Sequence, residues 1–526
     1  MLHADFQYNN SMKIKPQTLP DDPAELKALV QSLQEEMKLL REQLHILISK
    51  RFGRSSEKYD PNQLGLFDEA ELIGATAADD VEESATDKGG AASGHSRKKR
   101  GRKPFPDWLN RVEVIHELPE SERRCGVDGS ELVEIGREVS EQLDIVPAKV
   151  QVIRNIQIKY GCPHCKSGVK TAPAPRRPIP KLLGTAAMLA HVVVSKYADG
   201  LPLYRQGSIL TRAGIDLPRN TLAHWMILAG REIQPLINLM RDQLLAYPII
   251  QMDETPVQVL KEPQKIAQSK SYMWVQRGGP PDKPIILFHY DPTRSSKVPK
   301  DLLADYKGYL QTDAYAGYLD VAAQPDIIHL GCMSHARRKF DEAIKALGTN
   351  KNRKATRADE ALTMVQQLYA IEKELRKDEA DAETRFKVRQ AKAKPVMAEL
   401  RVWLEKNLPL TPPKSALGKA MAYLFTEWRK LIRYLDDGRL EIDNNACENA
   451  IRPFVIGRKG WLFSTSVKGV KASANLYSLI ETAKANGLEP FAYFQHLFTK
   501  LPYAERVDDF DRLLPWNVDK ADLSTS

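Results

Sequence analysis

The sequence predicts a multidomain chain of mixed α+β and α/β class, and three observations support this prediction. Five short runs rich in β-branched and aromatic residues follow one another between Tyr247 and Cys332. A stretch rich in Lys, Glu, Ala and Leu with helical spacing follows, over about 341–438. Near the start of the chain, leucines recur every seven residues from Leu26 to Leu47. With 526 residues the chain is long enough for roughly three to five domains.

The composition indicates which binding partners and which cellular location to expect. The formal net charge of +9 favours nucleic acid or another acidic partner. The longest apolar stretch, which begins at Leu182, is too short to span a bilayer, and the N-terminus lacks the order of a secretion signal. Five cysteines are a sparse, odd set for a disulfide scaffold. We therefore expect a cytoplasmic protein without a membrane segment.

Residues 1–22 form an N-terminal tail in this interpretation, and 23–52 form a coiled-coil helix. The apolar seam is made by Leu26, Val30, Leu33, Met37, Leu40, Leu44 and Leu47. Glu36 and Arg41 fall at g and e positions, where a parallel partner helix could form an ion pair with them. This pattern predicts a homo-oligomer. The alternative is a single amphipathic helix that packs on its own protein.

Residues 53–104 read as a linker. The segment 69–96 is acidic and rich in Ala, Gly and Ser, which bury too little apolar surface to order it. The linker ends in a basic run made by Arg97, Lys98, Lys99, Arg100, Arg102 and Lys103. Its RGRKP sequence is similar to a minor-groove hook, so we expect contact with DNA phosphates. The alternative is solvated surface charge.

Residues 105–180 resemble a zinc ribbon. Cys162 and Cys165 form one CxxC knuckle, and Cys125 with Asp128 repeats the spacing with an acid at the second position. The segment between these knuckles, VSEQLDIVPAKVQVIRNIQIKYG, alternates as strands do. We expect one structural Zn²⁺ on the three thiols with Asp128 or His164 as the fourth ligand. A metal-free ribbon with three buried thiols is the alternative.

Residues 181–246 read as a helical domain that contains a helix-turn-helix. The supporting helix is predicted over Leu203–Arg212, and Pro218 opens the second helix. The second helix carries Arg219, Asn220, Thr221, His224 and Trp225. Polar residues at this helix N-terminus reach bases or phosphates in DNA-binding proteins, although many such helix pairs never contact DNA.

A candidate catalytic domain spans 247–466. Its predicted strands are 247–260, 272–277, 284–290, 309–312 and 327–332, which is the strand count of a ribonuclease-H-like sheet. In such a sheet a carboxylate in the first strand, Asp253, lies beside one at the end of the fourth, Asp313. A later helix, with Asp443 as its expected N-cap, would present Glu448.

These acids predict a metal centre. Asp253 and Asp313 lie in apolar runs, where an unpaired carboxylate costs several kcal/mol unless a cation or hydrogen bonds compensate it. Three carboxylates suit two hard cations about 3.5–4 Å apart, and Mg²⁺ or Mn²⁺ would accept phosphate oxygens as further ligands. The sequence contains no P-loop, GxSxG or HExxH motif that would indicate other chemistry.

Ordered motifs along nearly the whole chain resemble the insertion-sequence-66 transposases of bacteria, a family of DDE transposases. They include RFGRSSEK, MDETP, QTDAYAGY, GCMSHARRKF and IDNNACENAIRPFVIGRKGWLF. The resemblance implies catalysis by Asp253, Asp313 and Glu448, cleavage of element ends, joining to target DNA, and accessory proteins encoded by the same element. The resemblance also implies that the protein is located at the bacterial nucleoid. The family often carries a second cysteine where this chain has Asp128.

Further basic residues are candidate DNA contacts near this centre: His335, Arg337, Arg338, Arg452, Arg458 and Lys459. A solvated helix face is the alternative for the first three. Residues 467–526 read as a C-terminal helical segment. Two other functions stay open at this point: a DNA-binding regulator or inactive domesticated relative, and a metal nuclease that does not join DNA.

Overall fold

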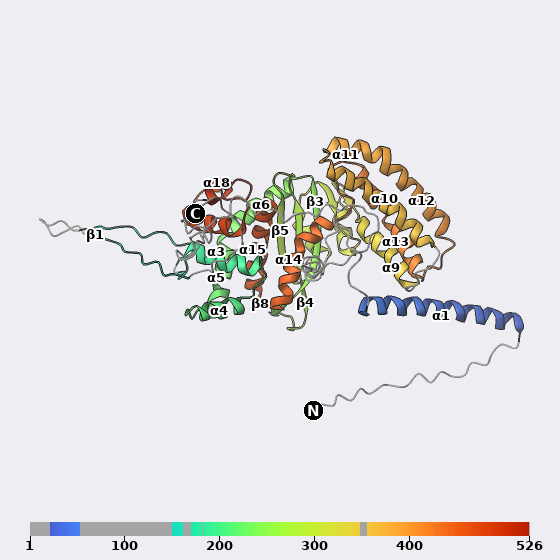
Figure 1. Ribbon diagram of the computed structural model, residues 1–526, viewed down its shortest axis with the longest axis horizontal. Helices are drawn as coiled ribbons and strands as arrows, with labels where there is room; N and C mark the ends of the chain where they lie inside the picture. Colours follow the sequence, from blue (N-terminus) through green and yellow to red (C-terminus); the bar gives the residue numbers. More distant parts are fainter. Residues whose placement is uncertain (1–21, 53–149, 161–169, 181, 348–354, 525–526) are drawn as a thin grey trace, which may run out of the picture. The chain divides into compact units, whose positions relative to one another are not determined.

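The computed structural model describes residues 22–52, 150–160, 170–180, 182–347 and 355–524 (Figure 1). Several predicted site residues lie outside these ranges, namely Arg97, Lys98, Lys99, Arg100, Arg102, Lys103, Cys125, Asp128, Cys162, His164 and Cys165. Among the described residues, no helix combines the length and the apolar character needed to cross a bilayer.

A mixed sheet forms the centre of the fold. Its strands are β3 (Ile249–Lys261), β4 (Lys270–Gly278), β5 (Ile285–Asp291), β6 (Gly308–Gln311) and β7 (Ile327–Leu330). The order is β5-β4-β3-β6-β7, and β8 (Ser464–Ser466) pairs with the far end of β3. β4 and β5 run antiparallel to their neighbours, whereas β6 and β7 run parallel to β3. All five predicted strands are confirmed, with ends within two residues of the expected ones.

Two long helices cover this sheet. α14 (Asn445–Trp461) packs against β3 and β4, and α15 (Val467–Ala485) packs against β5. β5 is an edge strand, and α15 satisfies part of its free edge because Ser478 Oγ accepts the Phe288 amide at 2.7 Å. Thr482 Oγ1 likewise accepts the Ile286 amide at 2.9 Å. These hydroxyl contacts protect an edge that would otherwise pair with another strand.

The chain between 186 and 246, directly before β3, forms α3 (Ala186–Tyr197), α4 (Leu203–Arg212), α5 (Arg219–Glu232) and α6 (Gln234–Ala246). The helix pair α4 and α5 confirms the two predicted helices, and Pro218 stands at the N-cap of α5. α5 packs closely on α15 at Gly230, where an added Cβ would lie 2.6 Å from the Ala472 Cα. A larger residue there would push the two helices apart.

The predicted helical insertion is helical and has its own apolar core. The predicted range contains the end of α9 (Met333–Ala346), followed by α10 (Arg357–Lys377), α11 (Ala382–Val388), a π-helical turn (Arg389–Ala393), α12 (Lys394–Asn407) and α13 (Ala416–Leu431). Phe340, Leu368, Leu400 and Leu424 are fully buried in a cluster separate from the main cluster that contains the sheet residues Ile250 and Val275. The long gap between the second and third acids therefore encodes a packed helical unit.

α1 (Pro23–Phe52) presents two different faces. Its a/d seam is exposed, with Leu40 at 58% and Leu47 at 64% of full exposure. The other face contacts the insertion, because His45 Nδ1 lies 3.0 Å from the Ala346 carbonyl oxygen and Glu42 accepts the Ala416 amide at 3.2 Å. The helix thus packs on its own protein without using the seam.

Only part of the ribbon is described. β1 (Lys159–Tyr160) and β2 (Lys170–Thr171) pair antiparallel on either side of the Cys162 knuckle. The strand prediction is wrong for 150–158, which forms no regular element. Val152 is 93% exposed and Ile156 is 79% exposed, so among the described residues this run lacks the apolar cover that stabilises a strand.

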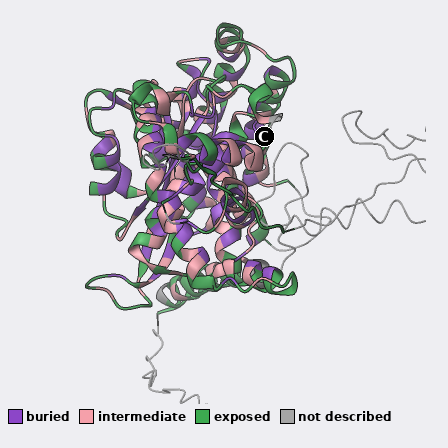
Figure 2. Cartoon of the chain, turned by 90° about the vertical axis from the view of Figure 1, so that its left-hand side faces the viewer, coloured by how far each residue is buried: buried purple, intermediate pink, exposed green. Residues whose placement is uncertain are grey.

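The remaining elements are short or C-terminal. They are α7 (Lys297–Leu302), η2 (Ala316–Tyr318), α8 (Leu319–Ala322), η4 (Ile432–Leu435), α16 (Pro490–Lys500), η5 (Leu501–Tyr503), α17 (Val507–Asp511) and α18 (Lys520–Ser524). Buried residues gather inside the folded region, whereas exposed residues line its outer helix faces and loops (Figure 2). The site described next lies where the sheet, α9 and the start of α14 meet.

Candidate active site

The sheet register brings Asp253 and Asp313 to the same level. β3 and β6 are parallel neighbours, and Gln251 pairs with Gln311. Asp253 lies two residues after Gln251, still within β3, and Asp313 lies two residues after Gln311, just beyond the end of β6. Because neighbouring strands lie about 4.8 Å apart, the two carboxylates start from adjacent backbone positions.

Two buried glutamines beneath these acids tie the site together. Gln251 Nε2 donates to Gln311 Oε1 at 2.7 Å, and Gln251 Oε1 accepts from Arg277 at 2.9 Å. Gln311 Nε2 donates to the Glu441 carbonyl at 2.9 Å, which joins the sheet to the segment before α14. The sequence analysis missed this pair, although a Gln-x-Asp pattern in both acid motifs was the available signal. Period-two alternation places each glutamine on the face of its acid.

The start of α14 is anchored next to Asp253. Asn444 Nδ2 donates to the Met252 carbonyl at 2.9 Å, and the Asn444 amide donates to Cys332 Sγ at 3.2 Å. Asn444 occupies the N-cap position, so the expectation that Asp443 would cap this helix is wrong by one residue. Asp443 instead accepts the Asn445 amide at 3.1 Å from one position further out. Glu448 lies in the first turn of the helix.

Glu448 faces residues from the N-terminal half of α9. Its Oε1 lies 3.7 Å from His335 Nδ1, and its Oε2 lies 3.8 Å from Arg338 Nη2. Cys332 Sγ belongs to the same group, because one ligand atom from each of Cys332, His335 and Glu448 lies within 4.8 Å of the others. Glu448 Oε1 and His335 Nδ1 are buried and, among the described residues, accept or donate no hydrogen bond.

The three acids influence one another electrostatically. Burial raises the pKa of Asp253 well above its ordinary value, and the charges of Glu254, Glu448 and Asp313 act in the same direction. Burial also raises the pKa of Glu448, with Arg338 opposing the shift and the charges of Asp443 and Asp313 adding to it. Like charges that raise one another's pKa favour either a bound proton or a bound cation.

The donor set fits a hard divalent cation. Carboxylates stand on β3, just beyond β6 and in the first turn of α14, and oxygen donors of this kind suit Mg²⁺ or Mn²⁺. Among the described residues, the group whose ligand atoms lie within 4.8 Å of one another is Cys332, His335 and Glu448. The buried Glu448 Oε1, which has no hydrogen bond among the described residues, is available as a ligand atom.

A second network, which the sequence analysis did not foresee, fixes the turn that follows Asp313. Glu254 accepts hydrogen bonds from Arg294 Nε at 2.8 Å and from the Tyr318 hydroxyl at 2.5 Å. Asp313 Oδ1 accepts the Tyr315 amide at 2.9 Å, and the Arg294 guanidinium stacks 3.7 Å from the centre of the Tyr315 ring. Glu254 is thus occupied by partners within the chain.

The other predicted contact residues have distinct settings. Arg458 donates to Thr255 Oγ1 at 3.1 Å, and Arg452 Nε is buried with no hydrogen bond among the described residues. Arg337 lies over the Tyr369 ring at 5.6 Å, and Lys459 is exposed. The predicted contact residues Arg219, Asn220 and His224 are exposed on α5. Trp225 is only 4% exposed and belongs to the core, so it presents no surface to DNA.

Comparison with known protein families gives matches along most of the chain. Residues 181–472, more than half of the chain, match the family described as "Transposase IS66 family". Residues 478–516 match the "IS66 C-terminal element", and 122–166 match the "zinc-finger binding domain of transposase IS66". Residues 39–114 match "Transposase C of IS166 homeodomain".

Relatives from Sinorhizobium fredii (strain NBRC 101917 / NGR234) cover almost the same length. The uncharacterized protein y4jD is 32% identical over 524 residues, which is 96% of this chain and 98% of the relative. The uncharacterized protein y4qI is also 32% identical, over 94% of this chain and 91% of its own length. The uncharacterized protein y4hP is 28% identical over 94% and 90%.

Proposed function

The chain belongs to the IS66 transposase family, and on this premise we propose that it cuts DNA at the ends of an insertion element and joins the freed ends to target DNA. Two observations support this proposal: the sheet register sets Asp253 and Asp313 at the same level on neighbouring strands, and Glu448, in the first turn of α14, is coupled electrostatically to both aspartates. A divalent ion is the simplest partner for these three acids, and the family is one of DDE transposases.

The proposed fold of the catalytic domain is ribonuclease-H-like. Three antiparallel strands followed by two parallel ones, with the first strand in the middle, support this assignment. β3 and β6 then deliver Asp253 and Asp313, and α14 delivers Glu448 after the helical insertion. The domain boundaries 247–466 and 341–438 stay as proposed from the sequence.

The proposed chemistry assigns a role to each part of the site. Asp253, Asp313 and Glu448 hold Mg²⁺ or Mn²⁺, which when bound supplies an activated water or 3′-hydroxyl and stabilises the leaving oxygen. The Gln251–Gln311 pair and the Asn444 side chain keep the three acids in place without touching DNA. Arg338, 48% exposed beside Glu448, is positioned to contact a phosphate next to the scissile bond.

Additional modules are proposed to hold the DNA. Arg219, Asn220 and His224 are exposed at the start of α5, where a helix N-terminus favours phosphate contact. The zinc-finger match over 122–166 supports one structural Zn²⁺ on Cys125, Cys162 and Cys165, with Asp128 or His164 as the fourth ligand. Elemental analysis of the purified protein should find close to one zinc per chain, and a metal-free ribbon would give none.

The protein is proposed to act as a homo-oligomer on both ends of its element. The exposed a/d seam of α1 supports this, because seven apolar side chains at heptad spacing favour burial against a partner helix. Deletion of residues 23–52 should lower the mass measured by light scattering. Accessory proteins of the same element are further expected partners, and the DNA substrate places the protein at the nucleoid in the cytoplasm.

Incubation of purified protein with labelled element ends, target DNA and Mg²⁺ tests the proposal. Both nicked and joined products are expected, and both should disappear when Mg²⁺ is omitted. Nicked products alone would identify a nuclease that does not join DNA. Binding without either product would identify a regulator or an inactive relative, and the transposition proposal would be wrong in both cases.

A further inference from the structure

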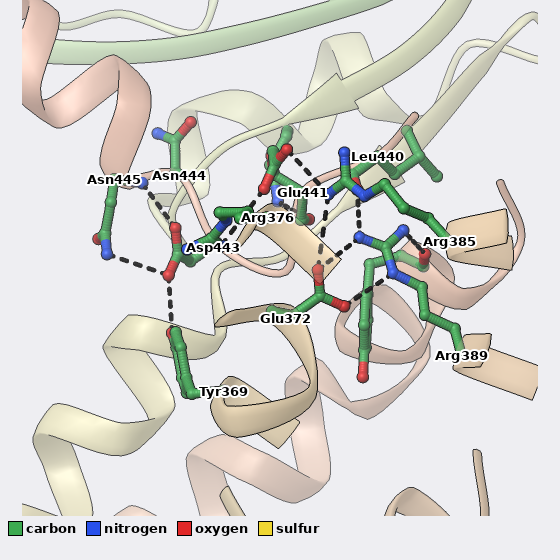
Figure 3. A network of polar contacts seen from close by, with 12 residues as sticks. Tyr369, Glu372, Arg376, Arg385, Arg389, Leu440, Glu441, Asp443, Asn444 and Asn445 are labelled. Atoms are coloured by element: carbon green, nitrogen blue, oxygen red, sulfur yellow. Dashed lines mark hydrogen bonds and ion pairs between the residues drawn. The ribbon is translucent and has the colours of Figure 1, made fainter. Parts of the chain in front are cut away.

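The helical insertion grips the chain segment that leads into α14. Figure 3 shows α10 presenting Tyr369, Glu372 and Arg376 toward this segment, which spans 434–445. These residues are three and four positions apart, so they lie on one face of the helix. The segment connects the insertion to the helix that carries Glu448.

A buried ion pair lies at the centre of the contacts between the insertion and this segment. Arg389 Nε and Nη2 each lie 2.8 Å from a different oxygen of Glu372, and the two side chains are 0% and 1% exposed. The same guanidinium donates to the carbonyls of Tyr434 at 3.0 Å, Asp437 at 3.1 Å and Leu440 at 2.9 Å. Arg389 is the first residue of the π-helical turn, and such turns are frequent at functional sites. One buried side chain therefore fixes three carbonyls of the connecting segment.

Outer contacts hold the same segment from its exposed side. Glu441 accepts from Arg385 at 3.0 Å and pairs with Arg376 at 3.6 Å. Gly438 allows a close approach to α11, because a Cβ at this position would lie 1.7 Å from the Ala382 carbonyl oxygen. The backbone between 437 and 441 is thus pinned to the insertion along its whole length.

Tyr369 supplies the last link before the helix. Its hydroxyl donates to Asp443 Oδ2 at 2.8 Å. Asp443 in turn accepts the Asn445 backbone amide at 3.1 Å and the Asn445 side-chain amide at 3.0 Å. Asn445 is the first residue of α14, and Glu448 follows within the same turn. A side chain of the insertion thereby reaches the helix start through a single carboxylate.

We propose that Tyr369 is a positioning residue, through which the helical insertion sets the place of Glu448 relative to Asp253 and Asp313. The proposal rests on the proposed function of that site. The Tyr369 hydroxyl acts through its hydrogen bond to Asp443, whereas the Tyr369 ring lies under Arg337 of α9 at 5.6 Å. The insertion is then part of the catalytic apparatus as well as a spacer in the sequence.

The Tyr369→Phe variant tests this proposal, with Tyr434→Phe as its matched control. The Tyr434 hydroxyl is also buried within the insertion but has no hydrogen bond among the described residues, so its removal leaves no partner behind. Nicking rates of the full-length protein would be measured in single turnover against Mg²⁺ concentration. For Tyr369→Phe the half-saturating Mg²⁺ concentration should rise roughly three- to tenfold, with a smaller change in the maximal rate. For Tyr434→Phe it should stay at the wild-type value.

Hydrogen exchange gives a second measurement that is independent of activity. The amides from Asn445 to Glu448 should exchange at least about threefold faster in Tyr369→Phe than in the wild type, because the helix start has lost one restraint. A variant that is merely less stable would lower the active fraction and leave the half-saturating Mg²⁺ concentration unchanged. Asp443→Asn removes the charge from the same link and should reproduce both effects.

Three outcomes would overturn the proposal. One is a Mg²⁺ titration of Tyr369→Phe that overlays that of the wild type, and another is an equal shift in Tyr434→Phe. The third is unchanged exchange of the amides at the start of α14. If the wild-type protein itself fails to nick DNA, the proposed function is wrong, and the exchange measurement still decides whether Tyr369 positions this helix.

Discussion

The candidate active site and the helical insertion both contain carboxylates removed from solvent, but the two regions surround these carboxylates with different partners. In the insertion, Arg389 contacts both oxygens of Glu372 at 2.8 Å, and each of these side chains is at most 1% exposed. In the site, Glu448 lies 3.7 Å from His335, whose pKa is lowered by burial, and 3.8 Å from the Arg338 guanidinium. Both clusters adjoin the 434–445 segment, so one stretch of chain separates the two kinds of acid.

This difference separates acids that hold the fold from acids reserved for a ligand. A buried carboxylate that serves structure is neutralised within the chain, since an unpaired buried charge is strongly destabilising. Within the part of the chain that the structure describes, Asp253 has no such partner, and burial together with the charge of Glu254 raises its pKa well above the ordinary value. Under the proposed function, the repulsion among these acids is relieved when a divalent cation binds.

The largest expected effect comes from removing one of the site's charges. Asp253→Asn should lower the nicking rate by about 10⁴-fold, equivalent to roughly 5.4 kcal/mol, because the variant loses a carboxylate ligand of the metal. Without metal its thermal stability should equal or exceed that of the wild type, since repulsion is relieved. Single-turnover cleavage and calorimetry measure these quantities. The exposed Asp320→Asn is the control, and retained nicking by Asp253→Asn would remove this acid from the site.

In the insertion, by contrast, removing a buried charge is expected to lower the stability of the fold. Glu372→Gln leaves the buried Arg389 without a matching charge and should lower the free energy of unfolding by about 3–5 kcal/mol. Urea denaturation measures the loss. Glu374→Gln on the same helix changes a side chain that is 69% exposed and should shift stability by less than about 0.5 kcal/mol. Equal effects of the two variants would contradict the structural role of the buried pair.

A smaller loss is expected at the boundary between the two regions. Gln311→Leu keeps the size of the side chain but leaves the Glu441 carbonyl and the Gln251 amide without their partner. The free energy of unfolding should fall by about 1–3 kcal/mol, the usual cost of an unsatisfied buried polar group. Gln268→Leu, at an exposed position, serves as the control in the same denaturation experiment. A change no larger than the control's would show that the glutamine pair is not needed to join the sheet to α14.

The smallest expected effect is stabilisation by the metal itself. Mg²⁺ at ten times its dissociation constant should raise the free energy of unfolding of the wild type by about 1.4 kcal/mol. The Asp253→Asn variant should show no such gain, whereas Glu372→Gln should retain it because the acids of the site are intact. Thermal unfolding with and without Mg²⁺ measures this difference. Equal stabilisation of all three proteins would place the ion elsewhere.

The sequence predicted the sheet and its acids for a simple physical reason. Strand signals are local, and a parallel register of β3 and β6 follows from pairing similar apolar runs, which sets Asp253 and Asp313 level. The helix pair α4 and α5 could be predicted from the sequence equally well, because Pro218 and the Gly214 turn mark its boundaries.

The supporting contacts could not be predicted in the same way. Glu372 and Arg389 belong to helices with many charged residues, and spacing alone does not tell which charge is buried. The link from Tyr369 to Asp443 joins residues 74 positions apart. The cap of α14 shifted from Asp443 to Asn444 because Asn444 bonds to Met252 on the sheet, a contact that no local rule includes.

Anomalous scattering from crystals grown with Mn²⁺ and element-end DNA would locate the proposed ion. We predict Mn²⁺ bonded to carboxylate oxygens of Asp253, Asp313 and Glu448, at the roughly 2.0–2.2 Å typical of small hard cations. Mn²⁺ that avoids these carboxylates, or an arrangement with DNA in which Glu448 stays apart from both aspartates, would contradict this prediction.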